Sequence, residues 1–223
     1  MLKGVIFDLD GTLLDSMGIW EQIDIQFLSS RGFDVPEDYA QTIAPMGFLQ
    51  AAEYTIRRFS LPDTPAQLVQ EWNAMAERAY RETVRLKPFV KEYLTFLRER
   101  HIPLAVATAS QEILYKAALE NNGIYNFFDS FTTLADVRRG KGFPDIYLQA
   151  ARQMKLLPEQ CAVFEDIYDG ITGARSGGFY TVAVYDPCSE KEKQKMQKEA
   201  DLYIESFAQL LAQPGLLQIG PAC

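Results

Sequence analysis

Five short apolar runs, separated by longer segments with helical periodicity, constrain this chain more than any other feature. The runs are 4–7 (GVIF), 102–108 (IPLAVAT), 161–165 (CAVFE), 180–185 (YTVAVY) and 201–205 (DLYIE). Uninterrupted apolar runs of this length are typical of strands that lie in a parallel sheet, because helices cover both faces of such a sheet. The sequence therefore predicts an α/β fold.

A long interval without a strand pattern follows the first apolar run. Within it, helical periodicity is visible in three segments, 16–32, 48–59 and 64–83. Thr64 has the character of an N-cap and Pro65 suits the first helical position. We therefore expect residues 16–86 to form a helical insert, and residues 1–15 and 87–223 to form the domain that holds the sheet.

The composition excludes several classes of protein. The formal net charge is -8 and the isoelectric point is about 4.8, so we expect no nucleic-acid partner. No segment has the apolar length of a membrane span, and the N-terminus does not resemble a signal peptide. Three widely spaced cysteines, Cys161, Cys188 and Cys223, are typical of reduced thiols. We expect a cytoplasmic monomer whose last residues, 215–223, are frayed.

Polar side chains stand where three of the predicted strands end. They are Asp8 and Asp10 after the first run, Thr108 and Ser110 after the second, and Glu165 and Asp166 after the third. Ligands of open parallel sheets bind beyond the carboxyl ends of the strands. The three strand ends therefore predict one shared site at one edge of the sheet.

Four carboxylates at one edge need a cation. Asp8, Asp10, Glu165 and Asp166 would repel one another unless a positive charge neutralised them. Mg²⁺ suits such a site, because it binds a few carboxylate oxygens together with water and phosphate oxygens. The only histidine, His101, is expected in a turn, which disfavours a histidine-based zinc site and a Ser-His-Asp triad.

Four segments resemble, in order, the motifs of the haloacid dehalogenase-type (HAD) phosphotransferases. They are DLDGT (8–12), AVATAS (105–110), GKGFPDIY (140–147) and VFEDIYDGITGARSGG (163–178). The insert resembles the α-helical cap of the subgroup that contains β-phosphoglucomutase and phosphoglycolate phosphatase. This resemblance implies a Rossmann-like, HAD-like core, with the insert acting as a lid that determines substrate specificity.

The resemblance also implies catalytic roles. Asp8 would attack phosphorus and form an aspartyl-phosphate, since a carboxylate can carry a phosphoryl group. Asp10 would protonate the leaving alcohol and later take a proton from water. Thr108 would hold a phosphoryl oxygen, and Lys141 would neutralise charge on the nucleophile and on the transferring group. Gly142 departs from the proline that often follows this lysine, which loosens the loop.

The metal and phosphate ligands follow from the same resemblance. Asp8, Asp166 and the carbonyl of Asp10 would bind Mg²⁺, with Glu165 contributing directly or through water. Further residues would line the phosphate site, namely Gly11, Thr12, Ala109 and Ser110. Asp169 has two interpretations, because related phosphatases often carry Asn or Asp there, whereas an acidic residue also favours the start of a helix.

Four residues of the insert are candidates for contact with the substrate, namely Met17, Trp20, Glu21 and Phe48. A structural interpretation competes with this one, because Trp20, Ile23 and Phe27 follow helical spacing and could pack the core of the insert. Glu21 and Asp24 could bind substrate hydroxyls or could be solvated charges.

The resemblance implies a phosphatase that acts on a small phosphorylated metabolite, such as a sugar phosphate. A β-phosphoglucomutase-type mutase is the alternative, but Trp20 stands where that mutase carries a histidine, and its cap arginine has no counterpart here. A non-enzymatic phosphoacceptor switch is a further alternative. Asp10 and the long insert argue against it, because a switch needs neither a leaving-group acid nor a lid.

Overall fold

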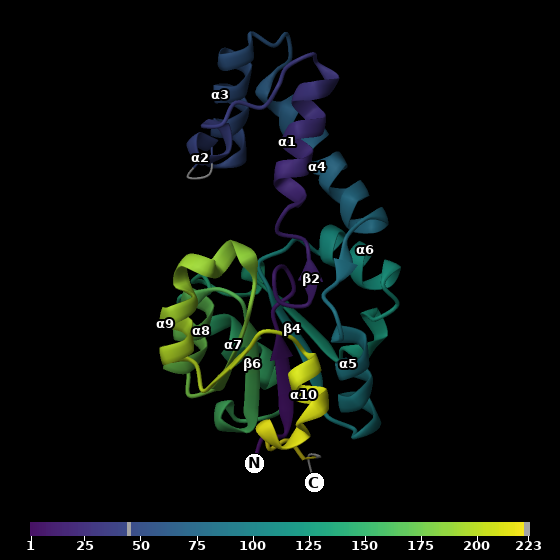
Figure 1. Cartoon of the computed structure of the whole chain (residues 1–223), viewed down its shortest axis with the longest axis vertical. Coiled ribbons are helices and arrows are strands. Elements are labelled where there is room, and N and C mark those ends of the chain that lie inside the picture. The colour runs from purple at the N-terminus through teal and green to yellow at the C-terminus, as the bar shows by residue number, and fades with distance from the viewer. Residues whose placement is uncertain (44–45, 221–223) are drawn as a thin grey trace. The chain divides into compact units, whose positions relative to one another are not determined.

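The structure, a computed structural model, describes residues 1–43 and 46–220 and divides into two compact units (Figure 1). The sheet unit combines Met1–Ser16 with the chain from Arg85 onward. The helical unit, Met17–Val84, lies within the range 16–86 expected for the insert. Each unit has its own secondary structure and its own buried core.

Within its described residues, the sheet unit contains eight strands and six α-helices, besides short 3-10 turns. The strands are β1 Gly4–Phe7, β2 Leu14–Asp15, β3 Arg85–Leu86, β4 Leu104–Thr108, β5 Ser130–Thr133, β6 Cys161–Glu165, β7 Tyr180–Val184 and β8 Leu202–Ile204. The helices are α5 Val90–Glu99, α6 Glu112–Asn121, α7 Asp145–Gln153, α8 Tyr168–Ser176, α9 Lys193–Glu199 and α10 Ala208–Ala212. The helical unit contains α1 Ile19–Ser30, α2 Tyr39–Ile43, α3 Phe48–Phe59 and α4 Pro65–Glu82.

The main sheet has the order β5-β4-β1-β6-β7-β8, and all its pairings are parallel. The predicted α/β class and five predicted strands are confirmed. The sequence analysis missed β5, whose residues SFTT include little apolar surface. Because β5 lies at the edge of the sheet, it does not need the apolar run that marks a central strand.

Side chains of the central strands alternate between two apolar layers. Ile6 and Val163 belong to the cluster that packs on α7. Phe7 and Phe164 point to the other face, where the ring of Phe164 stacks on Phe207 near α10. Figure 1 shows α7, α8 and α9 on one side of the sheet and α5 and α10 on the other. This alternation decides the face that each strand-end side chain reaches.

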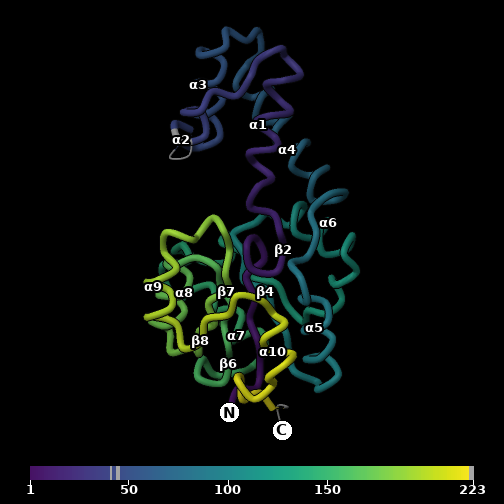
Figure 2. Tube along the Cα trace, viewed as in Figure 1, coloured from purple at the N-terminus to yellow at the C-terminus, as the bar shows by residue number. Residues whose placement is uncertain are grey.

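The C-terminal segment is ordered as far as Gly220, so the expected frayed end at 215–223 is wrong for its described part. Leu217 is buried, and Ile219 forms a parallel bridge with Leu2. The Leu2 N–H donates to the carbonyl of Gln218, at 3.0 Å between nitrogen and oxygen. The tube in Figure 2 shows the two ends of the described chain close together. Residues 221–223 lie outside the described range.

The helical unit follows its sequence pattern closely. Three predicted segments form α1, α3 and α4. Thr64 caps α4, since its Oγ1 accepts from the Gln67 N–H while the Gln67 side chain accepts from the Thr64 N–H at 2.8 Å. Ile23 and Phe27 are buried in the core of this unit.

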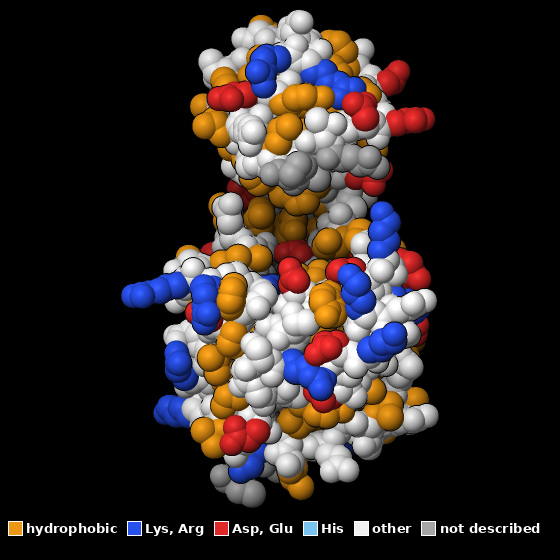
Figure 3. Space-filling model, turned by 90° about the vertical axis from the view of Figure 1, so that its left-hand side faces the viewer, with side chains coloured by type: hydrophobic (Ala, Val, Ile, Leu, Met, Phe, Trp, Pro, Cys, Tyr) orange, Lys and Arg blue, Asp and Glu red, His pale blue; other side chains and the backbone are white. Residues whose placement is uncertain are grey.

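Helix hydrophobicity, the cysteines and the surface charges each bear on an expectation from the sequence. None of the helices formed by residues 1–43 and 46–220 combines the length and hydrophobicity that crossing a membrane requires. Cys161 is a buried free thiol and Cys188 an exposed one, whereas Cys223 lies outside the described residues. On the visible face of the sheet unit, acidic and basic side chains are interspersed (Figure 3).

Gly173 of α8 has no side chain, which lets the loop before α7 pack closely against this helix. A Cβ atom at Gly173 would lie 2.0 Å from the carbonyl oxygen of Lys141. Replacing a mid-helix glycine by alanine usually stabilises a helix by about 1 kcal/mol. We predict the opposite for Gly173→Ala, a loss of about 1–3 kcal/mol in the free energy of unfolding measured with urea, because the loop must move.

Gly140→Ala is the matched control, since a Cβ there meets nothing within 4 Å. Its free energy of unfolding should stay within about 0.5 kcal/mol of the unaltered chain. A Gly173→Ala variant as stable as this control would contradict the packing described.

Candidate active site

Strand geometry brings the strand-end residues together at the carboxyl edge of the sheet. Asp8 follows β1 and lies two residues after Ile6, and Glu165 ends β6 two residues after Val163. Because side chains alternate along a strand, both carboxylates point to the face that carries α7. The neighbouring strand β4 ends with the buried side chain of Thr108.

Three buried carboxylates form the centre of this edge. Asp8, Glu165 and Asp166 each offer one oxygen, and these oxygens all lie within 4.8 Å of one another. The three side chains are at most 3% exposed. Three like charges at this separation in a buried place repel strongly, which requires a compensating positive charge.

Lys141 supplies one positive charge. Its ammonium group pairs with Asp8 Oδ1 and, at 2.7 Å, with Glu165 Oε1. Burial by itself lowers the pKa of Lys141, but the carboxylates of Asp8 and Glu165 outweigh this effect, so the pKa is raised and the lysine is charged. Lys141 therefore lies where it can neutralise charge on Asp8.

The loop after β1 links two of the carboxylates. Thr12 Oγ1 lies 3.3 Å from Asp8 Oδ2 and 3.0 Å from Asp166 Oδ1, within hydrogen-bond reach of both. Gly11 has a φ of 85°, and a Cβ there would lie 2.1 Å from Asp166 Oδ2. Only glycine leaves room for Asp166 at this turn. Thr12, expected to line the phosphate site, therefore also orients the acids.

Tyr147 of α7 is a site residue that the sequence analysis did not single out. Its hydroxyl donates to Glu165 Oε1 at 2.7 Å, and both side chains are buried. Glu165 also fills the space above Gly170, where a Cβ would lie 2.5 Å from the Glu165 carboxyl carbon. The segment GKGFPDIY contains Tyr147, but nothing in its spacing shows that the hydroxyl would face Glu165.

The remaining carboxylate oxygens lack partners. Glu165 Oε2 and Asp166 Oδ2 are buried and have no hydrogen-bond donor among the described atoms. Burial, together with the neighbouring carboxylates, raises the pKa of Asp166. Burial likewise raises the pKa of Glu165, although Lys141 opposes it. One lysine therefore does not balance the three acids, and the donor set fits a hard divalent cation.

The other core candidates lie near this centre with partners of their own. The Asp10 carboxylate accepts a hydrogen bond from Ser16 Oγ at 2.6 Å, and Asp10 is not among the three clustered acids. Thr108 Oγ1 accepts from the N–H of Ser110 at 3.0 Å. Ala109, between them, is exposed. The carboxyl edge of the sheet thus carries the Asp10 carboxyl group and the Thr108 hydroxyl group in addition to the three clustered acids.

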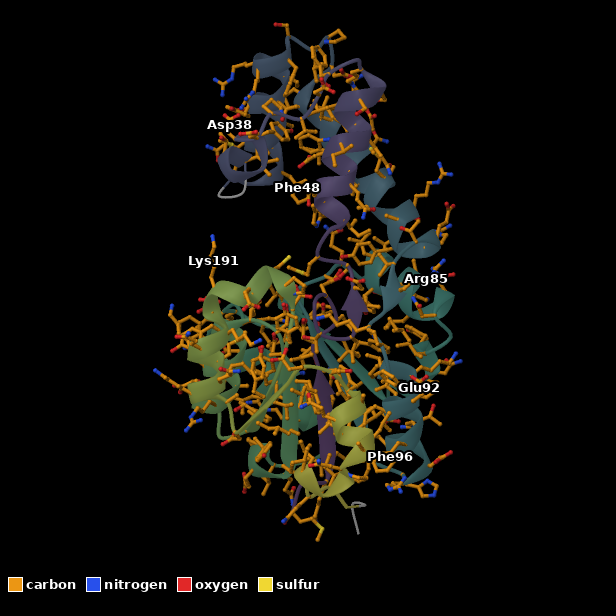
Figure 4. The ribbon with its side chains drawn as sticks, viewed as in Figure 1. Asp38, Phe48, Arg85, Glu92, Phe96 and Lys191 are labelled. Carbon is orange, nitrogen blue, oxygen red and sulfur yellow. The ribbon has the colours of Figure 1, made fainter. Side chains whose placement is uncertain are left out.

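The candidates in the helical unit form a separate group. Trp20 and Phe48 pack edge to face with ring centroids 5.3 Å apart, and they are 38% and 44% exposed. Figure 4 labels Phe48 at the start of α3, beside α1. Met17 and Glu21 are also exposed. Asp169 belongs to the sheet unit and lies exposed in the first turn of α8.

Comparisons with known proteins identify relatives along most of the chain. Residues 2–178 match the family model described as haloacid dehalogenase-like hydrolase. The chain is 30% identical over 183 residues to fructose-1-phosphate phosphatase YqaB of Escherichia coli, covering 81% of this chain and 95% of that protein. It is 28% identical over 210 residues to hexitol phosphatase A of Escherichia coli, covering 93% of each.

A solved structure from Thermotoga maritima, named as a candidate β-phosphoglucomutase, superposes with a TM-score of 0.86. The superposition covers 97% of this chain and 100% of that chain at 24% identity. At this identity the superposition shows the fold alone.

Asp166 should destabilise the metal-free chain, because its pKa is higher in the folded state than in the unfolded state. Such a carboxyl makes folding less favourable as the pH rises from about 4 through its folded pKa. We predict that Asp166→Asn increases the free energy of unfolding in a chelator at about pH 8 by roughly 1 kcal/mol or more. The gain should shrink as the pH falls toward about 4.

Asp169→Asn serves as the control, because Asp169 is exposed. It should lower the free energy of unfolding slightly, by at most about 1 kcal/mol, since an acidic residue near a helix N-terminus is favourable. If Asp166→Asn is less stable than the unaltered chain at about pH 8, the charge of Asp166 does not destabilise the metal-free fold, and the prediction is wrong.

Proposed function

Because the chain belongs to the haloacid dehalogenase-like hydrolase family, we propose that it is a Mg²⁺-dependent phosphatase of a small phosphorylated sugar or sugar alcohol. The observation that carries the proposal is the buried Asp8 carboxylate, held by Lys141 beside two further acids at the carboxyl edge of the sheet. Two relatives support the substrate class by their names, fructose-1-phosphate phosphatase YqaB and hexitol phosphatase A.

The carboxylate cluster fits the metal that the proposal requires. Asp8 and Asp166 would hold Mg²⁺, with the carbonyl of Asp10 and the unpartnered oxygen of Glu165 as further donors. When bound, Mg²⁺ would neutralise the acids and the charge on the phosphoryl oxygens. Lys141 would share this neutralisation, because it is charged and buried beside Asp8.

In the first half of the reaction, an oxygen of Asp8 attacks phosphorus and forms the aspartyl-phosphate. The bond between phosphorus and the ester oxygen breaks, and protonated Asp10 gives its proton to that oxygen, so the alcohol leaves neutral. The Thr108 hydroxyl holds a phosphoryl oxygen during the transfer. Ser16, which donates to Asp10 Oδ1, orients the acid.

In the second half, water attacks phosphorus of the aspartyl-phosphate. Asp10, now a carboxylate, takes a proton from that water, and the bond between phosphorus and the Asp8 oxygen breaks. Inorganic phosphate leaves, and both aspartates return to their starting states. The organic part of the substrate is proposed to contact side chains of the helical unit, namely Met17, Trp20, Glu21 and Phe48.

Loss of the nucleophile should stop turnover without unfolding the chain. We predict that Asp8→Asn releases less than about 0.1% of the phosphate that the unaltered chain releases from 4-nitrophenyl phosphate with Mg²⁺, because an amide cannot form the acyl phosphate. Phosphate release should also stop in a chelator and return with added Mg²⁺. Asp169→Asn should keep its activity.

Three other outcomes would decide against the proposal. Appreciable turnover by Asp8→Asn would remove Asp8 from the nucleophile role. A single stoichiometric phosphorylation without turnover would indicate a phosphoacceptor switch. Conversion of β-glucose 1-phosphate to glucose 6-phosphate, stimulated by the bisphosphate, would indicate a mutase.

Tyr147 should act as a positioning residue, because it holds the Glu165 oxygen that also faces Lys141. We predict that Tyr147→Phe lowers kcat by about tenfold and raises the Mg²⁺ concentration needed for half-maximal activity by roughly tenfold, with little change in KM. Tyr93→Phe is the control, since Tyr93 is a buried tyrosine of α5 that contacts aromatic rings. Equal Mg²⁺ requirements in the two variants would contradict this role.

A further inference from the structure

The helical unit contains a pocket of its own with a volume of about 570 Å³, here called the helical-unit pocket. All its described lining residues lie in Met17–Val84, on α1, α2, α3 and α4 or in the segment leading to α3. This volume is in the range that holds a small metabolite. The lining residues of the pocket include Trp20, Glu21, Asp24, Phe48 and Trp72.

Aromatic rings form part of the wall. Trp20 and Phe48 keep more than a third of their surface exposed, whereas Ile23 and Phe27, on the same helix as Trp20, are buried. The rings of Trp20 and Phe48 lie edge to face. Exposed aromatic faces in a concave site suit the carbon skeleton of a polar ligand, and they also attract cations.

Two carboxylates lie in the same pocket, three residues apart on one face of α1. No ion pair or side-chain hydrogen bond within residues 1–43 and 46–220 involves Glu21 or Asp24. Some other acids of this unit do form ion pairs, as Asp38 does with Arg58 and Glu71 with Arg31. Burial, with help from Glu21, raises the pKa of Asp24 to about 6.

Trp72 also belongs to the pocket wall. Its indole Nε1 is buried, so a ligand in the pocket would contact the ring and not the N–H. The pocket therefore combines aromatic rings with two carboxylates that have no counter-charge.

We propose that the helical-unit pocket binds a small organic amine. Its ammonium group lies against Asp24 and Glu21, and its carbon skeleton contacts Trp20 and Phe48. A neutral sugar would leave the two carboxylates without a counter-charge, so the amine is the better fit. The amine is either a free metabolite or the organic part of a phosphorylated substrate. The binding itself does not rest on the proposed phosphatase activity.

A fluorescence titration of the full chain tests this binding. The chain has two tryptophans, and both line the pocket, so intrinsic tryptophan fluorescence reports on it directly. Glucosamine and glucose are matched probes, since they differ by an ammonium group in place of a hydroxyl. We expect a saturable change with glucosamine and binding of glucose that is weaker by at least about tenfold.

Asp24→Asn is the informative variant, and Glu53→Gln, which removes an exposed carboxylate of the same unit, is its control. Asp24→Asn should weaken glucosamine binding by at least about tenfold, whereas Glu53→Gln should leave it unchanged. Removing a half-buried charge without a partner should not lower the melting temperature, so a loss of binding would not reflect unfolding.

Kinetics distinguish the two sources of the amine. If kcat/KM for glucosamine 6-phosphate exceeds that for glucose 6-phosphate, and Asp24→Asn removes the preference, the amine belongs to the substrate. Equal kcat/KM values with intact glucosamine binding assign the pocket to a separate ligand. The proposal is wrong if glucosamine binds no more tightly than glucose and if the two 6-phosphates have equal kcat/KM values. It is also wrong if Asp24→Asn changes neither the binding of glucosamine nor the kinetic preference. A chain that binds glucosamine but hydrolyses no phosphate ester would refute only the phosphatase.

Discussion

The sheet unit is organised around the repulsion among three buried carboxylates. Asp8, Glu165 and Asp166 are close enough to share an ion, and Lys141 offsets only part of their charge. Several neighbours serve this arrangement, since Gly11 and Gly170 leave space for the acids while Thr12 and Tyr147 orient them. A bound cation, alone or together with a phosphoryl group, would reduce the repulsion that remains among the three carboxylates.

Much of this site could be predicted from the sequence, because its residues belong to elements with strong local patterns. The apolar runs identify β1, β4 and β6, and the carboxyl ends of parallel strands lie at one edge. Asp8, Thr108 and Glu165 follow directly from that rule. Lys141 lies in a loop, so its approach to Asp8 could be expected only from the motif order.

Other features depend on contacts that no local pattern records. Tyr147 has the spacing of a helix core residue, and its hydroxyl reaches Glu165 only because α7 packs over β1 and β4, beside β6. The edge strand β5 has no apolar run, since it pairs with a strand on one side only and most of its residues are partly exposed. In the helical unit, Ile23 and Trp20 share one helical spacing and both line the helical-unit pocket, yet only Ile23 is buried, which the spacing could not predict.

The bridge between Leu2 and Ile219 has a practical consequence. It brings both ends of the described chain to the amino edge of the sheet, opposite the edge where Asp8 and Asp166 lie. An affinity tag or a surface linker fused at either end would therefore attach far from the carboxyl edge of the strands. Immobilised enzyme, attached through either terminus, would present that edge to the surrounding solution.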